Sequence, residues 1–550
     1  MYNSSNRVRA IVAGAALGVI FTGAAYAETT ATGLTGEAPA AVALQVALAA
    51  PDAAADPARA YYQSAAYRGV WFGPEGDDRA ARALIAALGE ADVHALPAGR
   101  YRVQVLQAAL AAAAGGAPAA IATAELAFTR VFLAYARDLS SGALEPRSVD
   151  RDLHVVPPRP NEAFLLARMA DSPVETIVRL APADPGYARL KDKLADLRGL
   201  PPDAWGPTAP GGGSIRAGES SPRVAVIRAR LVALGYHQEI TPVLAPTVYD
   251  PLLGASVRAF QRDYGLNDDG VIGQRTVEAM NASIEDRIGQ VIVNMERMRW
   301  TNRDPGRRHI FVNQADFTVQ LIDDGVVLFD ERVVIGARRH RTPEFSDEMT
   351  HMVFNPTWNV PRSIATKEIL PLLQEDPEYL SKKNMRLVSS SGETPPDPAT
   401  TDWSLYSAAD FPYRVKQNPG RGNSLGRVKF MFPNHHAIYL HDTPSKSLFR
   451  KDARAFSHGC IRVQDPMRLA EALLAAQNAD PSGLIERHLG SGRETVVQLD
   501  TPIPVHLDYR TAWIGDDGHA RYREDVYGRD TRVLAALVAL GVKLDASADG

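Results

Sequence analysis

The 550-residue sequence contains very little cysteine, and Cys460 is the single example. One thiol cannot form an internal disulfide, so a fold held together by disulfides is excluded. An unpaired thiol in an exported chain indicates instead a reactive group. Neither sign of charge is in large excess, because the net charge is only −4. The chain therefore lacks the basic character that nucleic-acid binding requires, and we predict no nucleic-acid partner.

Long apolar runs are missing except near the N-terminus. Residues 1–27 have the parts of a secretory signal: Arg7 and Arg9, an apolar run over 10–24, and an Ala-Tyr-Ala cleavage site at 25–27. The run is shorter than the roughly twenty residues of a bilayer span, so an uncleaved membrane anchor is the alternative interpretation. We predict no transmembrane segment after it, and a periplasmic location of the Gram-negative type.

Composition and periodicity divide the rest of the chain into a mostly helical part and a strand-rich part, which makes it an α+β multidomain protein. Residues 28–56 are rich in Ala, Thr, Gly and Pro and predict a flexible tether. Apolar spacing over 57–200 predicts a helical scaffold domain, completed by a patterned helix over 282–300. Residues 201–220, rich in Pro and Gly, indicate a linker.

Residues 221–281 have a pattern of their own. Two amphipathic helices, the second carrying Phe260-Gln261, are followed by Asp269-Gly270 and Ile272-Gly273 before a third helix. This order of motifs resembles the small three-helix peptidoglycan-binding domain found beside many wall enzymes. The resemblance implies binding of peptidoglycan glycan or peptide by this segment. A helical spacer built on the same scaffold is the alternative, because a fold alone does not guarantee binding.

From His309 the apolar period changes from helical to alternating, which marks a β-rich domain over 307–528. Within it, Asp323-Asp324-Gly325 predicts a hairpin turn. Residues from about 374 to 427 are rich in Pro, Gly, Ser and charge, and we interpret 374–415 as a mobile lid over a cleft. Residues 529–550 predict a closing helix and a tail.

Cys460 lies in the segment Phe456-Ser457-His458-Gly459-Cys460-Ile461-Arg462, downstream of His441 at the end of an apolar run. A thiol attacks as the thiolate, and its free pKa of about 8.5 means that a nearby imidazole must favour ionisation. Gly459 has no Cβ, so the amides of His458, Gly459 and Cys460 are candidate donors to an oxyanion. Acyl transfer through a thioester needs these groups, and we predict neither a metal nor another cofactor.

Two other interpretations of this region stay open. A free cysteine is often a small buried hydrophobic residue, although Ser, His, Gly and Arg are unusual neighbours for a core position. A zinc site is the second, but no CxxC or HxxxH spacing connects the nearby histidines, His435, His436, His441 and His458. The first two of these follow Pro433-Asn434 and are most simply turn residues before a strand.

His441, a gap of fifteen residues, and then Ser457-His458-Gly459-Cys460-Ile461-Arg462 resemble the signature of the L,D-transpeptidase catalytic domain, the YkuD-like family. The resemblance implies that Cys460 is the acyl-accepting nucleophile and His441 the general base, oriented by the backbone carbonyl of Asp442. It further implies that His458 and Gly459 belong to the catalytic loop. The residues predicted to bind substrate are Ser457, Arg462, Tyr439, Trp358 and Asn355. For the last two, structural packing is the competing interpretation.

The implied activity is the formation of 3→3 cross-links between donor and acceptor stem peptides of peptidoglycan through a cysteine thioester. The residues by themselves imply acyl transfer by a thiol and no particular substrate. If water resolves the thioester, the same fold is an L,D-carboxypeptidase or amidase; attachment of a protein to the wall and exchange of D-amino acids are further alternatives. An inert thiol would leave a non-catalytic peptidoglycan-binding scaffold.

Overall fold

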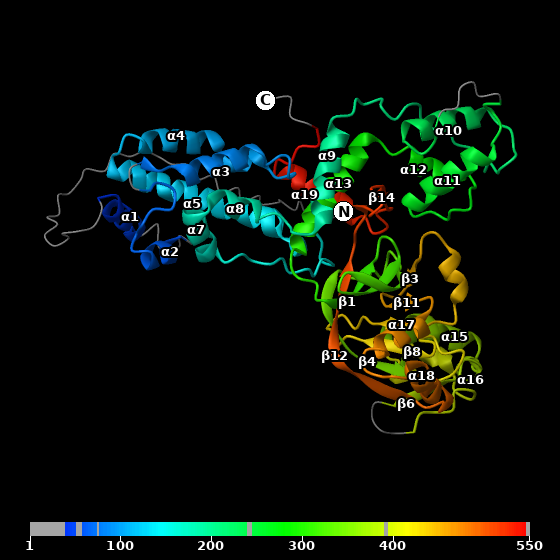
Figure 1. The fold of residues 1–550 in the computed structure, drawn as a ribbon. Helices are drawn as coiled ribbons and strands as arrows, with labels where there is room; N and C mark the ends of the chain where they lie inside the picture. The colour runs from blue at the N-terminus through cyan, green and yellow to red at the C-terminus, as the bar shows by residue number, and fades with distance from the viewer. Residues whose placement is uncertain (1–38, 51–57, 74–75, 239–244, 390–393, 546–550) are drawn as a thin grey trace, which may run out of the picture.

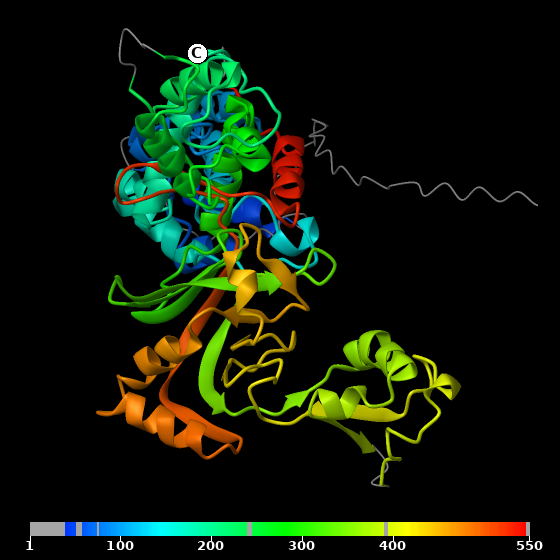
Figure 2. The same ribbon diagram turned by 90° about the vertical axis from the view of Figure 1, so that its right-hand side faces the viewer.

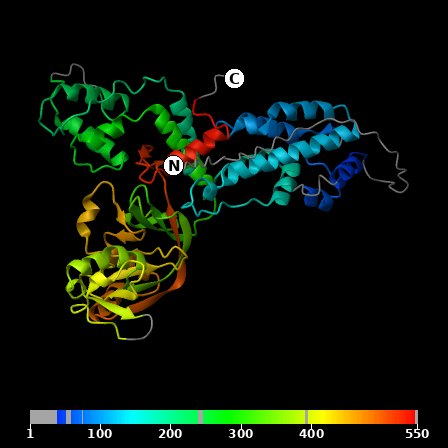
Figure 3. The ribbon, with the colours of Figure 1, turned by 180° about the vertical axis from the view of Figure 1, so that it is seen from behind.

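The computed structural model describes residues 39–50, 58–73, 76–238, 245–389 and 394–545. The predicted signal peptide lies outside these residues. Figure 1 shows a long helical region beside a smaller helical module, with a β-rich domain below them, and Figure 3 shows the same arrangement from behind. The predicted α+β multidomain class is confirmed.

The helical region is built from the N-terminal helices together with α13 and α19. Helix α13 begins with a capping box, in which Ser283 and Asp286 each bond the other's backbone amide. It packs against α9, α5 and α19, so the chain returns here after the small module. The elements are α1 (Pro39–Ala49), α2 (Arg59–Ser64), α3 (Arg79–Gly89), η3 (Ala98–Tyr101), α4 (Val103–Ala113), α5 (Pro118–Ser141), α6 (Pro146–Val149), α7 (Glu162–Asp171), α8 (Pro173–Val178), α9 (Pro185–Arg198), α13 (Ile284–Trp300) and α19 (Arg529–Ala539).

Helix α1 corrects part of the predicted tether. Its residues are rich in alanine, which has the highest helix propensity of all residue types. Leu44 and Leu48 are buried, and the helix packs along α5. This stretch of the segment 28–56 is therefore an ordered part of the helical region rather than a tether.

Helix α5 differs from the prediction that no later segment could cross a membrane. Its 24 residues, with a mean hydropathy of 1.3 over the most apolar window, have the length and composition of a span. However, 56% of that window is buried in the helical region, as in the central helix of a packed bundle. Phe128 and Phe132 are fully buried beside Trp71, and the buried carboxylate of Glu125 accepts from the amides of residues 70–72.

The small module consists of α10 (Pro222–Ala233), α11 (Pro251–Asp263) and α12 (Gln274–Met280). The buried side chain of Gln261, which is 2% exposed, explains why the module has its Phe-Gln and Asp-Gly motifs. The side-chain amide of Gln261 donates to the carbonyl of Val271 at 3.0 Å, and its oxygen accepts from the amide of Gly270 at 2.9 Å. The Phe-Gln and Asp-Gly pieces therefore build the turn that joins α11 to α12.

The β-rich domain contains a nine-stranded sheet in the order β10-β3-β11-β9-β8-β4-β12-β1-β2. An additional pairing of β2 with β3 closes this sheet on itself, which leaves few free edges. The predicted hairpin turn joins these two strands, with positive φ at Asp324 and Gly325. The bounds are β1 (Arg308–Asn313), β2 (Thr318–Asp323), β3 (Val326–Gly336), β4 (Phe345–Phe354), β8 (Val428–Met431), β9 (Leu440–His441), β10 (Ala455–Ser457), β11 (Ile461–Val463), β12 (Thr495–Asp508), η6 (Lys446–Arg450), α17 (Pro466–Leu474) and α18 (Pro481–Gly490).

The described residues of the predicted lid are part of a larger, ordered subdomain over residues 358–389 and 394–417, which we call the insertion. In Figure 2 it projects sideways from the closed sheet. It has its own apolar core, centred on Trp403, Phe411 and Leu373, so it is not a structureless loop. Its elements are β5 (Trp358–Asn359), α14 (Arg362–Ile364), the π-helix η4 (Ala365–Ile369), α15 (Leu370–Glu375), α16 (Tyr379–Lys382), β6 (Met385–Ser389), η5 (Trp403–Leu405) and β7 (Tyr413–Gln417).

The last strands leave the β-rich domain before its predicted end at residue 528. Strands β13 (Ala512–Ile514) and β14 (Ala520–Tyr522) form a hairpin that contacts α9 and α11. Ala512 and Tyr522 belong to the core of the helical region, whereas Tyr509 and Tyr527 on either side belong to the core of the sheet. The hairpin therefore ties the β-rich domain to both helical units.

Candidate active site

Two neighbouring parallel strands lie next to the predicted nucleophile and base. Strands β9 and β11 pair so that His441 lies opposite Arg462. Tyr439 and Cys460 lie just before these strands, each two residues from a member of that pair. The ring centroids of Tyr439 and His441 are 5.6 Å apart. Tyr439 also hydrogen-bonds the Cys460 thiol, so it contacts both predicted residues.

The imidazole of His441 is held in one tautomer. Its Nδ1 lies 2.5 Å from the backbone carbonyl oxygen of Asp442, and because a carbonyl can only accept, Nδ1 carries the proton. Nε2 therefore keeps a free lone pair, as a general base requires. The carboxylate of Asp442 accepts from Lys446 Nζ at 2.8 Å and from the amide of Arg427 at 2.9 Å, which fixes the orienting residue in turn. The predicted orienting carbonyl is confirmed.

Burial determines the charge state of His441. The residue is 5% exposed, and burial, with a further contribution from the Arg462 guanidinium, lowers the pKa of its imidazole to about 3. The hydrogen bond to the Asp442 carbonyl raises the pKa but does not cancel the effect of burial. The imidazole is consequently neutral at neutral pH and can accept a proton there.

The pKa of the half-buried Cys460 thiol is raised, whereas the sequence predicts a thiol kept ionised by its neighbours. Burial raises the pKa of the thiol to about 11, although hydrogen bonds from Tyr439 and the charge of Arg462 favour the thiolate. The Sγ donates to the carbonyl oxygen of Ala437 at 3.6 Å. Burial of the side chain is a property of the fold that the local sequence does not contain. Attack therefore requires the proton to leave during the reaction rather than before it.

The raised pKa of the thiol predicts slow alkylation by iodoacetamide. Cys460 is the single cysteine, so the mass of the intact protein reports on it alone. Because the thiolate is the reactive species, the rate at pH 7 should be roughly 10²-fold below that of a cysteine of pKa about 8.5. The rate should still rise with pH at pH 10, and Arg462→Met, which removes a favourable positive charge, should slow it further. A rate that levels off near the ordinary thiol pKa would contradict this picture.

The loop before Cys460 is shaped by Ser457 and Gly459. The Oγ of Ser457 donates to the carbonyl of Cys460 at 2.5 Å and accepts from the amide of Gly459 at 3.1 Å. Gly459 has a φ of +117°, and a Cβ there would lie 3.2 Å from Ile438 Cδ1. The Gly459 amide, a predicted oxyanion donor, is thus already engaged. Those of His458 and Cys460 have no acceptor within the described part of the chain and are the candidate donors.

The side chain of His458 connects the cysteine loop to the insertion. Its Nε2 lies 2.6 Å from Oε1 of Glu368, in the π-helix η4. Its ring also packs against that of His340, with centroids 4.7 Å apart. These contacts join the cysteine loop to η4 and to His340, and the catalytic role of His458 stays a prediction.

Asn355 and Trp358, predicted to bind substrate, make structural contacts. The Nδ2 of Asn355 donates to the carbonyls of His488 at 2.9 Å and Arg493 at 3.2 Å, which ties the end of α18 to β4. These bonds use both of its amide hydrogens. Trp358 is half-buried against the core of the insertion. Packing, the competing interpretation, therefore describes the contacts of both residues.

Thr342 and Ala437 contact the cysteine loop but are absent from the predicted site. The Oγ1 of buried Thr342 donates to the carbonyl of Gly459 at 2.7 Å and accepts from the amide of Gly336 at 2.9 Å. Ala437, whose carbonyl accepts from the thiol, has a φ of +55°, which is uncommon for a residue with a Cβ. Each contact joins segments distant in the chain, so the local sequence carries no signal for it.

Comparison with known proteins gives matches to three family models. Residues 307–503 match the L,D-transpeptidase catalytic domain, residues 56–194 match a scaffold domain, and residues 220–280 match the "Putative peptidoglycan binding domain". A curated protein of Haemophilus influenzae, described as "Putative L,D-transpeptidase", is 36% identical over 231 residues. That match covers 41% of this chain and 45% of the relative, so the chain spans less than half of the relative's length.

Two solved L,D-transpeptidase structures are also similar to this chain. The one from Xylanimonas cellulosilytica is 14% identical, with a TM-score of 0.18, and covers 54% of this chain and 98% of that chain. The one from Stackebrandtia nassauensis is 12% identical, with a TM-score of 0.21, and covers 55% of this chain and 98% of that chain. At such low scores neither superposition supports a statement about this chain.

Proposed function

We propose that this chain, which carries an L,D-transpeptidase catalytic domain beside a scaffold domain and a peptidoglycan-binding domain, forms 3→3 cross-links between peptidoglycan stem peptides through a thioester on Cys460. The observation that supports the proposal is the parallel pairing of β9 with β11, in which His441 is the partner of Arg462, two residues after Cys460. The imidazole of His441 keeps a free Nε2 lone pair, and a base with a free lone pair together with a thiol are the groups that acyl transfer through a thioester needs.

The donor reaction begins when Nε2 of His441 takes the thiol proton and Sγ attacks the carbonyl carbon of the third stem residue. The negative oxygen of the tetrahedral intermediate is stabilised by the amides of His458 and Cys460. The C–N bond to the terminal D-Ala then breaks, and the amine leaves with the proton held by His441. These steps leave a thioester and return the imidazole to its neutral form.

The acceptor reaction repeats these steps with a second stem peptide. Its side-chain amine attacks the thioester carbonyl, and His441 takes one amine proton. The C–S bond breaks, the amide forms, and the proton passes back to sulfur. Arg462 favours the departing thiolate, because its positive charge lies on the same face of the sheet as Cys460.

The remaining domains fit a substrate outside the cytoplasm. Residues 220–280 match a peptidoglycan-binding domain, and we assign them the task of holding the chain on the wall polymer. Peptidoglycan is an extracytoplasmic polymer, so its use requires export, in line with the signal sequence predicted over residues 1–27. A periplasmic location belongs to this proposal.

Product analysis with purified disaccharide tetrapeptides tests the proposal. We expect a cross-linked dimer and one released D-Ala per cross-link, with no product from a Cys460→Ala control. Mass spectrometry of the dimer should place the new bond between the two third residues. Release of D-Ala without a dimer would show that water resolves the thioester, which would make the protein a carboxypeptidase. A dimer formed by the control protein would contradict the use of Cys460.

A further inference from the structure

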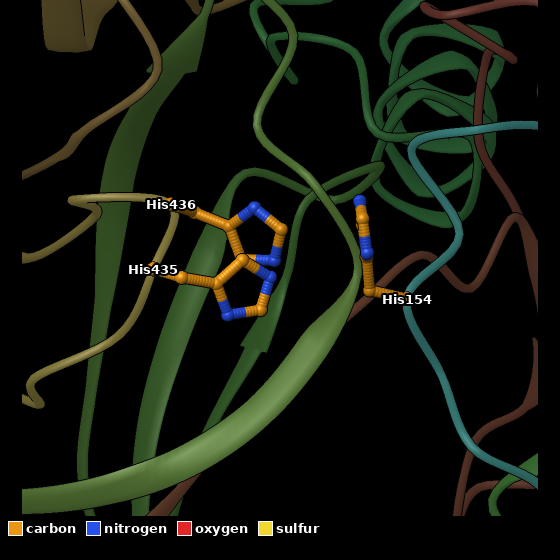
Figure 4. A group of neighbouring side chains, drawn as sticks. All are labelled: His154, His435 and His436. Atoms are coloured by element: carbon orange, nitrogen blue, oxygen red, sulfur yellow. The ribbon is translucent and has the colours of Figure 1, made fainter.

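Three histidines from two distant parts of the chain meet at the junction of the helical region and the catalytic domain. His435 and His436 lie in the turn between β8 and β9, and His154 lies in the segment after α6. The ring centroid of His154 lies 4.2 Å from that of His436 and 5.9 Å from that of His435. The ring centroids of His435 and His436 are 3.8 Å apart. Figure 4 shows both turn residues facing His154 across the gap between the two segments.

The distances suit a shared metal ion. One nitrogen from each ring lies within 4.8 Å of the others. Zinc binds imidazole nitrogens at about 2.0–2.1 Å, which separates two tetrahedral ligands by roughly 3.4 Å. Small rotations of three partly exposed side chains close that difference. Imidazole is a ligand that Zn²⁺, Cu²⁺ and Ni²⁺ all accept, and three histidines leave one position for water or another ligand.

One nitrogen of the cluster lacks a partner that the protein should supply. The Nε2 of His436 is buried and has no hydrogen-bond partner within the described residues. A buried polar atom without a partner costs free energy, and a bound ion is one way to satisfy it. Its ring packs against that of Phe345, with centroids 4.8 Å apart. The atom therefore has no protein ligand of its own among the described residues.

Charged groups of both signs act on the cluster. The carboxylate of Asp152 is the acidic group that acts on both rings, while the positive charge of Arg147 opposes a cation.

We propose that His154, His435 and His436 bind a divalent transition-metal ion such as Zn²⁺, which joins the helical region to the catalytic domain. The backbone on the helical side is already anchored, because the amide of His154 donates to the carbonyl of Glu344 at 2.8 Å. The ion adds a second connection, from the same histidine to the turn at residues 435–436. This site is separate from the thioester chemistry, which uses no metal.

The turn that supplies two ligands also supplies the acceptor of the catalytic thiol. Asn434 organises it, with Oδ1 accepting from the amides of His436 at 3.0 Å and Ile438 at 3.2 Å. The next residue after the ligands is Ala437, whose carbonyl accepts from Cys460 Sγ. Metal binding at residues 435–436 therefore fixes the backbone next to the nucleophile.

Isothermal titration of the full chain with ZnCl₂ tests the site. The titration uses a Cys460→Ala background, so that the thiol contributes no ligand. We expect one bound ion per chain, with affinity reduced more than tenfold by His435→Ala and by His154→Ala, because even residues that only support a metal ligand are worth about 10–100-fold. His519→Gln, which removes an exposed histidine of the β13–β14 hairpin, should leave the affinity unchanged.

A second measurement does not depend on the variants folding well. Hydrogen–deuterium exchange of the peptide covering residues 432–438 should slow when Zn²⁺ is added to the unmodified chain, and X-ray absorption should show imidazole ligands. No binding, equal affinity in all variants, or an absorption spectrum without imidazole would each overturn the proposal. The His435→Ala result is decisive, because that side chain is exposed and its loss should not disturb folding.

Discussion

Cys460→Ala should gain no mass when incubated with a carbapenem, whereas the unmodified chain should gain one equivalent. A strained β-lactam carbonyl acylates the same sulfur that accepts the stem peptide, and the chain has no other thiol. Intact-protein mass spectrometry measures both results directly. An adduct on the variant would place the nucleophile elsewhere, and no adduct on the unmodified chain would contradict a competent site.

His441→Gln should keep the thiol but slow this acylation by about 10²–10⁴-fold, the usual contribution of a general base. The glutamine amide can still donate to the Asp442 carbonyl, so the loss reports on the missing basic nitrogen rather than on a collapsed strand. The rate follows from the adduct mass over time. His351→Gln is the matched control, because it removes a half-buried neutral imidazole bonded to Thr350 on the same sheet. Equal rates for the two variants would exclude His441 as the base.

The sequence predicts the centre of this site better than its surroundings. The hydrogen bond between His441 and the Asp442 carbonyl, and the neighbouring strands next to His441 and Cys460, agree with what one short motif predicts. The protonated state of the thiol does not follow, since it depends on burial by the rest of the fold. The roles of Asn355 and of His154 depend on partners more than a hundred residues away.

The insertion shows why composition misleads about order. Pro, Gly and Ser are frequent in it, which predicts a mobile lid from residue 374. Its core instead combines aliphatic residues, many of them before residue 374, with widely spaced aromatic residues such as Trp403 and Phe411. Its contact with the site is made by Glu368, which lies before the predicted lid begins. The short π-helix η4 also lies between two short α-helices, so its residues show no apolar spacing in the sequence that distinguishes it from them.

Glu344 should be the charged residue whose loss costs the most stability. It lies just before β4 and is 1% exposed. Its two carboxylate oxygens accept from Arg297 of α13 at 2.7 Å and from Arg529 of α19 at 2.9 Å. Both arginines are also buried, at 2% and 0% exposed. The carboxylate of Glu344, in the β-rich domain, therefore pairs with a buried cation from each of two helices of the helical region.

Glu344→Ala should lower the free energy of unfolding by about 3–5 kcal/mol, because the buried Arg529 loses its carboxylate partner and the buried Arg297 keeps only Asp530, at 3.2 Å. Glu524→Ala is the matched control: Glu524 also pairs with two arginines, Arg275 at 2.7 Å and Arg338 at 3.0 Å, but its side chain is 51% exposed. Its loss should cost at most about 1 kcal/mol, since solvent screens such pairs. Urea unfolding followed by tryptophan fluorescence measures both. Similar midpoints for the two variants would mean that the buried pair does not hold the domains together.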